Sequence, residues 1–382
     1  MNGYFDYNAT APVRPQVHEA MIAALSEIPG NPSSMHAGGR RARSAIDQAR
    51  SQVAELAGVT PSEIIFTSGA TEANNLALRG AMAVDRKRHL IVSRMEHASV
   101  SATADALEQC GHSVLRLDVS PEGIPLLGRV ADILEKTDSV LSISCACGET
   151  GHTVDTDELL AVLPERHLLH VDATQAVGRL DRAVPERADL VSFSGHKLGG
   201  PAGTGVLVVR ERAKRRIAGI LSGGRQENGL RAGTENTAGI VGLGVAAAVV
   251  TQQARAETRR LRVLRDRIQS ALRTRIDELT VITPANGLPN TLMVSARFVA
   301  AETLVAGLDL EGYAISTGSA CAAASPEPSA VLEALGLEEQ IRNGAVRISL
   351  GWATHDQEID GFVDAFVAVA TRVRAASCGA AA

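Results

Sequence analysis

The chain has 382 residues, which is longer than one ordinary domain and favours a large and a small domain. Hydrophobic residues make up 45% and charged residues 21%, a composition typical of a globular protein with an ample core. The formal net charge of -5 gives no support to a nucleic-acid-binding surface over the whole chain.

The N-terminal residues, the longest apolar stretch and the cysteines give no indication of a secreted or membrane protein. Residues 1–6 contain no basic stretch followed by an apolar run, so we expect no signal peptide. The longest apolar stretch, residues 238–250, is too short to span a bilayer and is expected to be a buried helix. Five cysteines are an odd count that argues against a disulfide framework. We therefore expect a cytoplasmic protein without membrane contacts.

Short apolar runs alternate with helical patterns over the first two thirds of the chain. Strands are expected at residues 63–67, 89–93, 113–118, 139–145, 167–172, 189–194 and 205–209. Helices are expected between several of them, at residues 73–83, 99–110 and 156–163. This alternation indicates an α/β fold with a mainly parallel sheet, in which ligands gather outside the carboxyl ends of the strands.

A long helical pattern at residues 241–272 is expected to connect this large domain to a smaller C-terminal domain. The smaller domain would hold strands at 280–283, 291–295 and 346–350 and a helix at 301–308. Many arginines occur in the second half of the long helix, but acids are interleaved, which favours a solvated face over nucleic-acid contact. We place the large domain at residues 13–255 and the small domain at residues 1–12 and 256–382.

The first cluster of small polar residues follows the strand expected at 63–67 and opens a helix. It reads Thr-Ser-Gly-Ala-Thr-Glu over residues 67–72. Small side chains let a phosphate group approach the backbone, and the N–H groups and positive dipole end of a helix N-terminus bind it. Ala70 and Thr71 are therefore candidate phosphate-binding residues. The alternative is a plain N-cap, a Ser or Thr followed by Glu72.

Asp172 stands at the end of an apolar run, where a carboxylate is costly to bury unless it meets a cation. A protonated pyridine nitrogen would be such a partner, and its protonation makes the ring an electron sink. Gln175, three residues further, could donate to a phenolic oxygen of the same ring. The alternative for Asp172 is the N-cap of a helix.

Lys197 closely follows the strand expected at residues 189–194. An amine withdrawn from water loses its charge more readily and can then attack carbonyls, as a Schiff-base lysine must. Ser194 and His196 could add phosphate donors beside it; the alternative is a lysine on a solvated loop. His97 follows the strand expected at 89–93, and it could stack on a flat cofactor and move protons, or be merely structural.

These four clusters supply the parts of one pyridoxal phosphate site. They provide a phosphate cradle, a ring stacker, an acid for the ring nitrogen and a Schiff-base lysine. Each cluster alone is a weak signal, but their occurrence together, each after an expected strand, is far more specific.

Two residues in the C-terminal part could act on a substrate. Cys321 lies in a stretch of small residues, where an exposed thiol is a nucleophile if nearby groups favour the thiolate; a buried structural cysteine is the alternative. Arg347 alternates with apolar residues, which capture of a substrate carboxylate or a buried ion pair would explain. Cys145 and Cys147 are too closely spaced for a usual metal pair, so we predict no metal site and expect Cys145 to end a buried strand.

With these motifs the chain resembles the cysteine desulfurases of the NifS/IscS type, which are class V aminotransferase-like pyridoxal phosphate enzymes of fold type I. The resemblance implies an aspartate-aminotransferase-like α/β fold, a large domain with a mainly parallel mixed sheet, a smaller α+β C-terminal domain, and a homodimer with active sites near the subunit interface. It covers nearly the whole chain and includes Tyr-Phe-Asp-Tyr-Asn-Ala-Thr at 4–10, Gly-Asn-Pro-Ser-Ser at 30–34, Arg-Ala-Gly-Thr-Glu-Asn at 231–236 and Arg-Ile-Ser-Leu-Gly at 347–351.

The resemblance also implies roles for single residues. Lys197 would hold the cofactor and move the α-proton of L-cysteine, and Cys321 would take the substrate sulfur as a persulfide, leaving L-alanine. Arg347 would bind the substrate carboxylate, and Asn31 would border the substrate. Thr234 would reach the phosphate of the cofactor in the neighbouring subunit. The persulfide sulfur would pass to a protein acceptor, for iron–sulfur cluster assembly or for thiolation of a nucleic acid or cofactor.

One position departs from the family pattern. Gly148 stands where relatives carry an asparagine that touches the phenolic oxygen of the cofactor and borders the substrate. Its absence removes one hydrogen bond, worth about 1 kcal/mol, unless water or Cys147 fills the gap. Two alternatives therefore stay open: a pyridoxal phosphate-dependent selenocysteine or other C–S lyase, and a catalytically weakened subunit for sulfur relay or assembly.

Overall fold

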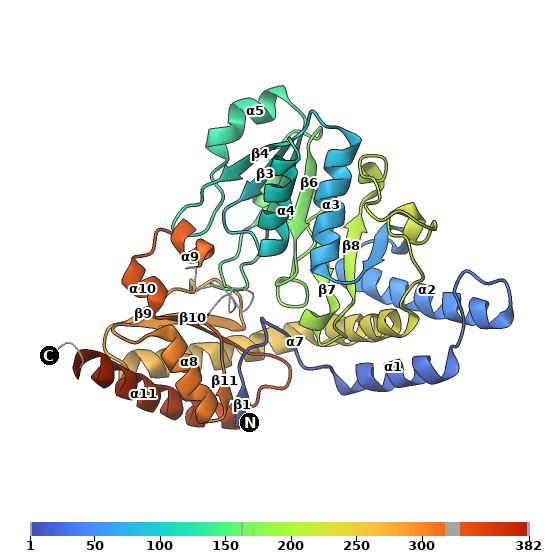
Figure 1. Cartoon of the computed structure of the whole chain (residues 1–382). Coiled ribbons are helices and arrows are strands. Elements are labelled where there is room, and N and C mark those ends of the chain that lie inside the picture. Colours follow the sequence, from blue (N-terminus) through green and yellow to red (C-terminus); the bar gives the residue numbers. More distant parts are fainter. Residues whose placement is uncertain (1, 162, 318–328, 380–382) are drawn as a thin grey trace.

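The computed structural model of the chain describes residues 2–161, 163–317 and 329–379 (Figure 1). The strands are β1 (Gly3–Tyr4), β2 (Ile64–Thr67), β3 (His89–Ser93), β4 (Ser113–Leu117), β5 (Ser139–Ser144), β6 (Leu168–Asp172), β7 (Leu190–Ser194), β8 (Gly205–Val209), β9 (Leu279–Val281), β10 (Thr291–Ala296), β11 (Tyr313–Ala314) and β12 (Ala345–Ser349).

The helices surround these strands. The α-helices are α1 (Pro15–Glu27), α2 (Ala37–Ala57), α3 (Ala70–Val84), α4 (Ala98–Gln109), α5 (Ala131–Lys136), α6 (Thr156–Ala161), α7 (Thr237–Arg275), α8 (Ala301–Leu310), α9 (Ala330–Ala334), α10 (Glu339–Asn343) and α11 (Asp356–Gly379). The short 3₁₀ helices are η1 (Pro61–Glu63), η2 (Leu127–Val130), η3 (Gly195–Leu198), η4 (Glu211–Ala213) and η5 (Glu227–Gly229).

A seven-stranded sheet in the order β2-β8-β7-β6-β5-β3-β4 forms the centre of the larger part. β8 is antiparallel to both of its neighbours, and all other pairs are parallel, which confirms the expected mainly parallel mixed sheet. Since β2 and β7 are both antiparallel to β8, they run in the same direction. The carboxyl ends of β2, β3, β5, β6 and β7 therefore meet at one edge of the sheet.

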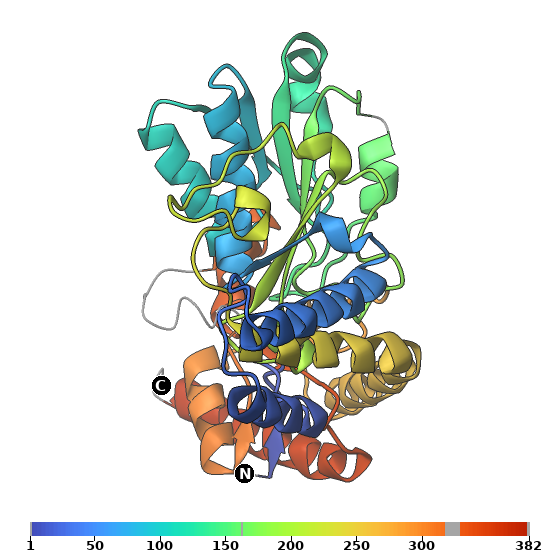
Figure 2. The same cartoon turned by 90° about the vertical axis from the view of Figure 1, so that its right-hand side faces the viewer.

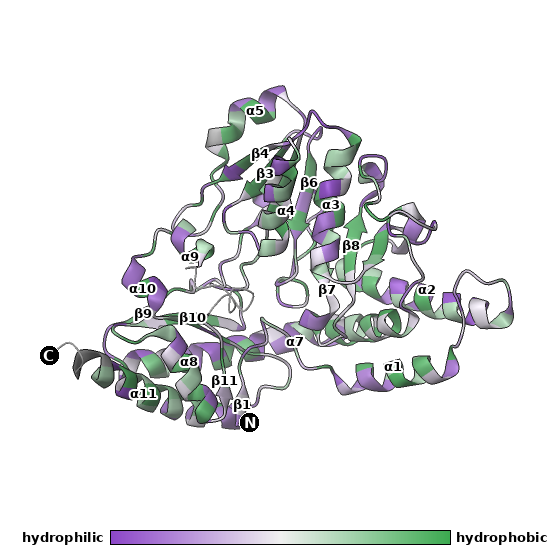
Figure 3. Cartoon of the chain, viewed as in Figure 1, coloured by the Kyte–Doolittle hydropathy of each residue, from purple (hydrophilic) through white to green (hydrophobic). Residues whose placement is uncertain are grey.

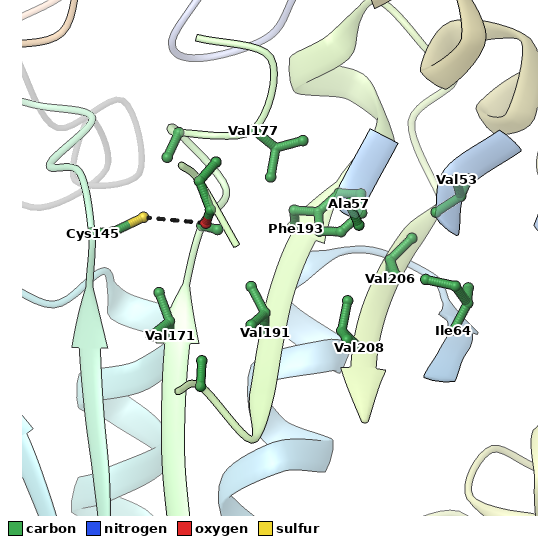
Figure 4. Packing of buried hydrophobic residues seen from close by; sticks show 14 of the residues in the cluster. Val53, Ala57, Ile64, Cys145, Val171, Val177, Val191, Phe193, Val206 and Val208 are labelled. Carbon is green, nitrogen blue, oxygen red and sulfur yellow. Dashed lines mark hydrogen bonds between the residues drawn. The ribbon is translucent and has the colours of Figure 1, made fainter. Parts of the chain in front are cut away.

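The central strands are buried on both faces, so their side chains alternate between two cores. Val206 and Val208 contribute to one core, whereas Leu207 between them contributes to the other. The first core lies against α2 and the first half of α7, and the second lies against α3 and α4. Figure 4 shows the valines of β6, β7 and β8 packed with Phe193 and Ala57, and Figure 3 shows these strands as mainly hydrophobic.

A separate hydrophobic core contains residues from near both ends of the chain. It joins Phe5 to the second half of α7, to β10 and β12, and to α8 and α11. The ring of Phe5 lies 4.4 Å from that of Phe362, centroid to centroid. β12, β10 and β9 form an antiparallel sheet, and β1 pairs with β11 in parallel. These separate cores support a division near residue 255, which stays a prediction.

α7 is one continuous helix of 39 residues that extends from the core around β8 and α2 to the core that contains Phe5 (Figure 1). Its glycines permit close packing of neighbouring helices: a Cβ on Gly244 would lie 2.6 Å from the Cα of Ala49 in α2. α1, α2 and the first half of α7 accordingly lie side by side (Figure 2). Within the described ranges, only α7 has the length and composition to cross a membrane, and much of its apolar part is packed inside the protein.

Candidate active site

Lys197 lies in η3, directly after the carboxyl end of β7. Gly199, with a φ of 78°, ends this 3₁₀ turn in the left-handed conformation that glycine adopts without strain. The lysine side chain is half-buried beneath the N-terminal segment, where Nζ donates to the carbonyl of Ala9 at 2.7 Å and also to that of Asn8. The lysine is therefore held by backbone carbonyls rather than extended into solvent.

Asp172 lies at the end of β6, beside the end of β7, and is 5% exposed. Its Oδ1 accepts from the backbone N–H of Thr174 at 2.9 Å, and its Oδ2 accepts from Nδ2 of Asn74 at 2.8 Å. The first bond closes a turn, and since β7 is the next described element after β6, Asp172 is not the helix N-cap that the alternative interpretation expected. The second bond comes from α3. In the described part of the chain, the buried hydroxyl of Thr174 has no hydrogen-bond partner, so a polar group remains available beside this carboxylate.

His97 is the N-cap of α4, after the carboxyl end of β3. Its Nδ1 accepts from the backbone N–H of Ser99 at 3.1 Å and lies 2.8 Å from the hydroxyl oxygen of that serine. Partial removal from water lowers the pKa of His97; the carboxylate of Asp172 opposes this shift and the amine of Lys197 adds to it. A neutral imidazole at this position can stack against a ring and exchange a proton.

The N-terminus of α3 lies against the end of β7. The N-cap residue Gly69 has no side chain to bind the first N–H groups of the helix, so those of Ala70 and Thr71 are left for a ligand or water. A Cβ on Gly69 would lie 3.9 Å from Oγ of Ser194, and one on Gly205 would lie 2.4 Å from the carbonyl carbon of Gly69. This close approach requires glycine at position 205. Free N–H groups, a helix dipole and a serine hydroxyl together fit a phosphate group.

Gln175 fills the space beside Gly148. A Cβ on Gly148 would lie 2.6 Å from Nε2 of Gln175 and 2.8 Å from its Cγ. Nε2 of Gln175 donates to the carbonyl of Asn8 at 3.1 Å, and its Oε1 accepts from Nη1 of Arg179. The absence of a side chain at position 148 is thus matched by a glutamine that occupies its place.

Arg347 lies in β12 and is 4% exposed. Its Nη2 pairs with Oδ1 of Asp6 at 2.6 Å, and its Nη1 donates to the carbonyl of Gly148 at 3.2 Å. The structure thus contains the buried ion pair that the sequence left open as an alternative. The guanidinium also lies beside residue 148 in the candidate site, so its role in binding a substrate carboxylate stays a prediction.

The remaining predicted residues differ in how they relate to this edge of the sheet. His196 follows β7, with Nδ1 3.1 Å from Oγ1 of Thr10, and burial lowers its pKa to about 4, so it is a neutral side chain. Asn31 lies exposed in the loop between α1 and α2, and Thr234 lies exposed before α7, so neither directly follows a strand of the seven-stranded sheet. Cys321 lies outside the described residues.

Two buried residues of the site were not predicted from the sequence. Both oxygens of Glu96 accept from Ser144, at 2.8 Å from its backbone N–H and 2.7 Å from its hydroxyl, and burial raises the pKa of Glu96 to about 8. Asn74 is fully buried in α3 and bonds to Asp172. A polar residue within the apolar face of a helix was the available signal for Asn74.

Comparisons with known proteins agree with this geometry. The family model for aminotransferase class-V matches residues 3–362, so the chain belongs to that family. Cysteine desulfurase IscS of Dictyoglomus turgidum is 39% identical over 379 residues, which cover 98% of this chain and 96% of that protein. The expected resemblance to cysteine desulfurases is thereby confirmed.

Solved structures give the same result for the fold. A structure described as a NifS-like protein has a TM-score of 0.89 and 33% identity, and the match covers 97% of this chain and 100% of that one. SspA in complex with cysteine has a TM-score of 0.77 and 33% identity, covering 91% of this chain and 99% of that one. The expected α/β fold of pyridoxal phosphate enzymes is confirmed by these matches.

Proposed function

We propose that the chain is a pyridoxal phosphate-dependent cysteine desulfurase that converts L-cysteine to L-alanine. The observation that carries this proposal is the meeting of Lys197, Asp172, His97 and the N-terminus of α3 at one edge of the sheet. The relatives named as cysteine desulfurases and the neighbour solved with cysteine support the substrate class.

The residues at this edge fit the cofactor group by group. The N-terminus of α3 and Ser194 would bind the phosphate, the carboxylate of Asp172 would accept from the ring nitrogen, and His97 would lie against the ring. Lys197 would form the bond to the cofactor aldehyde. When bound, pyridoxal phosphate supplies an electron sink for the carbanion at the substrate α-carbon.

The chain itself would then handle the proton and the sulfur. The amine of Lys197 would take the α-proton of cysteine, because it is the lysine at the carboxyl end of β7. The thiolate of Cys321 would attack the substrate sulfur: an S–S bond forms, the C–S bond breaks, and its electron pair stays with the carbon that becomes the methyl group of alanine. Arg347 would hold the substrate carboxylate.

A homodimer would complete the site. Thr234 and Asn31 are exposed on the single chain, and we propose that a second copy brings them to the cofactor phosphate and to the substrate. The sulfur held on Cys321 would be delivered to a protein acceptor in the cytoplasm, for iron–sulfur cluster assembly or for thiolation of a nucleic acid or cofactor.

The test is a cysteine-to-alanine assay with a reductant on the purified protein supplied with pyridoxal phosphate. Cys321→Ala should abolish alanine formation and retain the absorption band of the bound cofactor, whereas Lys197→Ala should abolish both. Cys110→Ala is the matched control, because Cys110 is a free cysteine exposed at the end of α4, and its loss should leave turnover unchanged. Full activity of Cys321→Ala would refute the persulfide mechanism and favour another C–S lyase.

The glycine at position 148 leaves a second candidate function open. Since position 148 offers no side chain to the cofactor, a weakened subunit for sulfur relay or assembly is the alternative. A wild-type protein that binds the cofactor without forming alanine would favour that alternative.

A further inference from the structure

A continuous set of buried polar side chains lies beneath the candidate site. Five elements contribute one residue each: β5, β6, β7, α3 and α4. The five residues are at most 8% exposed, and they are Ser142, His170, Ser192, Asn74 and Ser99. They link Asp172, the acid proposed for the ring nitrogen, to His97, the side chain proposed to lie against the ring.

The direction of the hydrogen bonds near His97 is fixed by a backbone donor. Because the N–H of Ser99 donates to Nδ1 of His97, this nitrogen carries no hydrogen, and the hydrogen of the neutral ring lies on Nε2. The hydroxyl of Ser99, 2.8 Å from the same Nδ1, must then donate to it as well. The oxygen of Ser99 in turn accepts from Nδ2 of Asn74 at 2.8 Å.

Asn74 has its orientation fixed in the same way. Only its NH₂ group can face the carboxylate of Asp172, so Nδ2 directs one hydrogen to Asp172 and the other to Ser99. Its Oδ1 therefore accepts from the hydroxyl of Ser192. Because the hydroxyl hydrogen of Ser192 is donated to Asn74, the hydroxyl oxygen accepts from Nε2–H of His170 at a distance of 3.0 Å.

The far end of the chain of bonds agrees with this order. Nδ1 of His170 is 2.8 Å from the hydroxyl oxygen of Ser142, which donates to it because Nε2 carries the hydrogen. His170 is fully enclosed, and burial lowers its pKa to about 4, which is consistent with a neutral ring that has one donor and one acceptor nitrogen. One arrangement of hydrogens thus satisfies every member from Ser142 to His97 and Asp172.

We propose that Asn74 is a positioning residue that holds Asp172 as a hydrogen-bond acceptor and orients the hydroxyl of Ser99 toward His97, whose Nε2–H tautomer is set by the backbone N–H of Ser99. As a consequence, His97 can exchange protons with a ligand only through Nε2. The part that concerns the ring nitrogen rests on the proposed function, while the hydrogen arrangement itself does not.

The hydrogen arrangement is tested on the chain without cofactor. In protein labelled with ¹⁵N-histidine, long-range ¹H–¹⁵N spectra should show both His97 and His170 as Nε2–H tautomers, with assignments from His97→Gln and His170→Gln. A hydrogen on Nδ1 of His97 would overturn the proposal. In Asn74→Leu, the hydroxyl of Ser192 loses its acceptor, so His170 should become a mixture of tautomers.

The role toward the cofactor is tested by titration with pyridoxal phosphate. Asn74→Leu should raise the dissociation constant by roughly 10- to 100-fold, the range expected for a lost hydrogen bond to a buried charge. Asn75→Leu is the matched control. Among the residues that the structure describes, the Asn75 side chain bonds only within α3, to the carbonyl of Thr71 and to Arg79, so its loss should change the constant less than about twofold. Unchanged affinity in Asn74→Leu would overturn the positioning role.

A second variant covers the case in which Asn74→Leu does not fold. Asn74→Asp keeps the shape and the acceptor for Ser192 but places a carboxylate against Asp172, so it should weaken cofactor binding and leave the His170 tautomer unchanged. Cofactor binding that matches the wild type would again refute the role of Asn74. If the wild type itself bound no cofactor, the proposed function would fail, while the tautomers would still test the network.

Discussion

The fit between Gly148 and Gln175 makes a substitution at position 148 the sharpest test of the site geometry. In Gly148→Ala, the added methyl carbon would lie 2.6 Å from Nε2 of Gln175 and 2.8 Å from both Cδ and Cγ. Contacts this short are not tolerated, and rotation of the outer amide alone does not relieve the one to Cγ. Gln175 must therefore leave its position and break its bonds to Asn8 and Arg179.

The size of the effect follows from those two bonds. One is between neutral groups and contributes about 1 kcal/mol, and the other is to a guanidinium and contributes about 1.5–3 kcal/mol. We expect the free energy of unfolding of Gly148→Ala to fall by about 2–4 kcal/mol, measured by urea denaturation of the cofactor-free protein. Gly148→Asn should lose a similar amount, and it should not raise turnover of cysteine.

Two further variants decide whether the clash is the cause. Gly128→Ala is the matched control, because a Cβ on Gly128 meets no atom within 4 Å, and it should be nearly neutral. The double variant Gly148→Ala/Gln175→Ala should be more stable than additivity predicts, with a coupling of about 1 kcal/mol or more. A loss below about 0.5 kcal/mol in Gly148→Ala, or strict additivity, would refute the reasoning.

Three other outcomes follow from buried charges. Burial raises the pKa of Glu96 from 4.5 to about 8, so the folded wild type holds this proton more tightly than the unfolded chain and should lose stability as pH rises from about 4.5 to 8. Glu96→Gln should lack this loss. If the stabilities of the wild type and of Glu96→Gln changed with pH in parallel, the expectation would be contradicted. In the wild type, Nη2 of Arg50 lies 2.6 Å from Oε1 of the buried Glu227, and Arg50→Met leaves this carboxylate without its charged partner. The free energy of unfolding, measured in urea, should fall by about 3–5 kcal/mol. A fall below about 1 kcal/mol would count against a structural role for this ion pair. Arg347→Lys cannot bind a carboxylate in two places and should raise KM for cysteine by about tenfold or more with a smaller change in kcat; an unchanged KM would exclude Arg347 from substrate binding.

The positions of the main site residues could be predicted because they depend on local patterns. Apolar runs predicted the strands at 89–93 and 205–209 with the bounds that the structure has, and the others within a residue or two. Asp172 ends such a run and Lys197 and His97 follow one, and the carboxyl ends of parallel strands necessarily share an edge. Cys145 likewise follows the buried strand β5, as expected.

Two helix bounds differ from the prediction, and one role could not be decided by any local pattern. α7 begins at Thr237, four residues before the expected start, because the side chain of Asn236 caps it by accepting from the N–H of Gly239. The predicted helix at 156–163 is described only as Thr156–Ala161. The alternatives for Arg347 could not be decided from the sequence, since its ion-pair partner Asp6 is 341 residues away.

The sequence by itself determined the family and the succession of strands and helices along the chain, and it predicted the side chains proposed to carry the chemistry. These features depend on periodicity and on residue type. The tertiary structure alone decided how Gln175 fills the space at Gly148, how the carbonyls of Asn8 and Ala9 hold Lys197, and how Asn74 joins Asp172 to His97. Each of these contacts joins distant segments whose approach is set by the packing of helices on the sheet. Their geometry therefore exists only once the cores have formed.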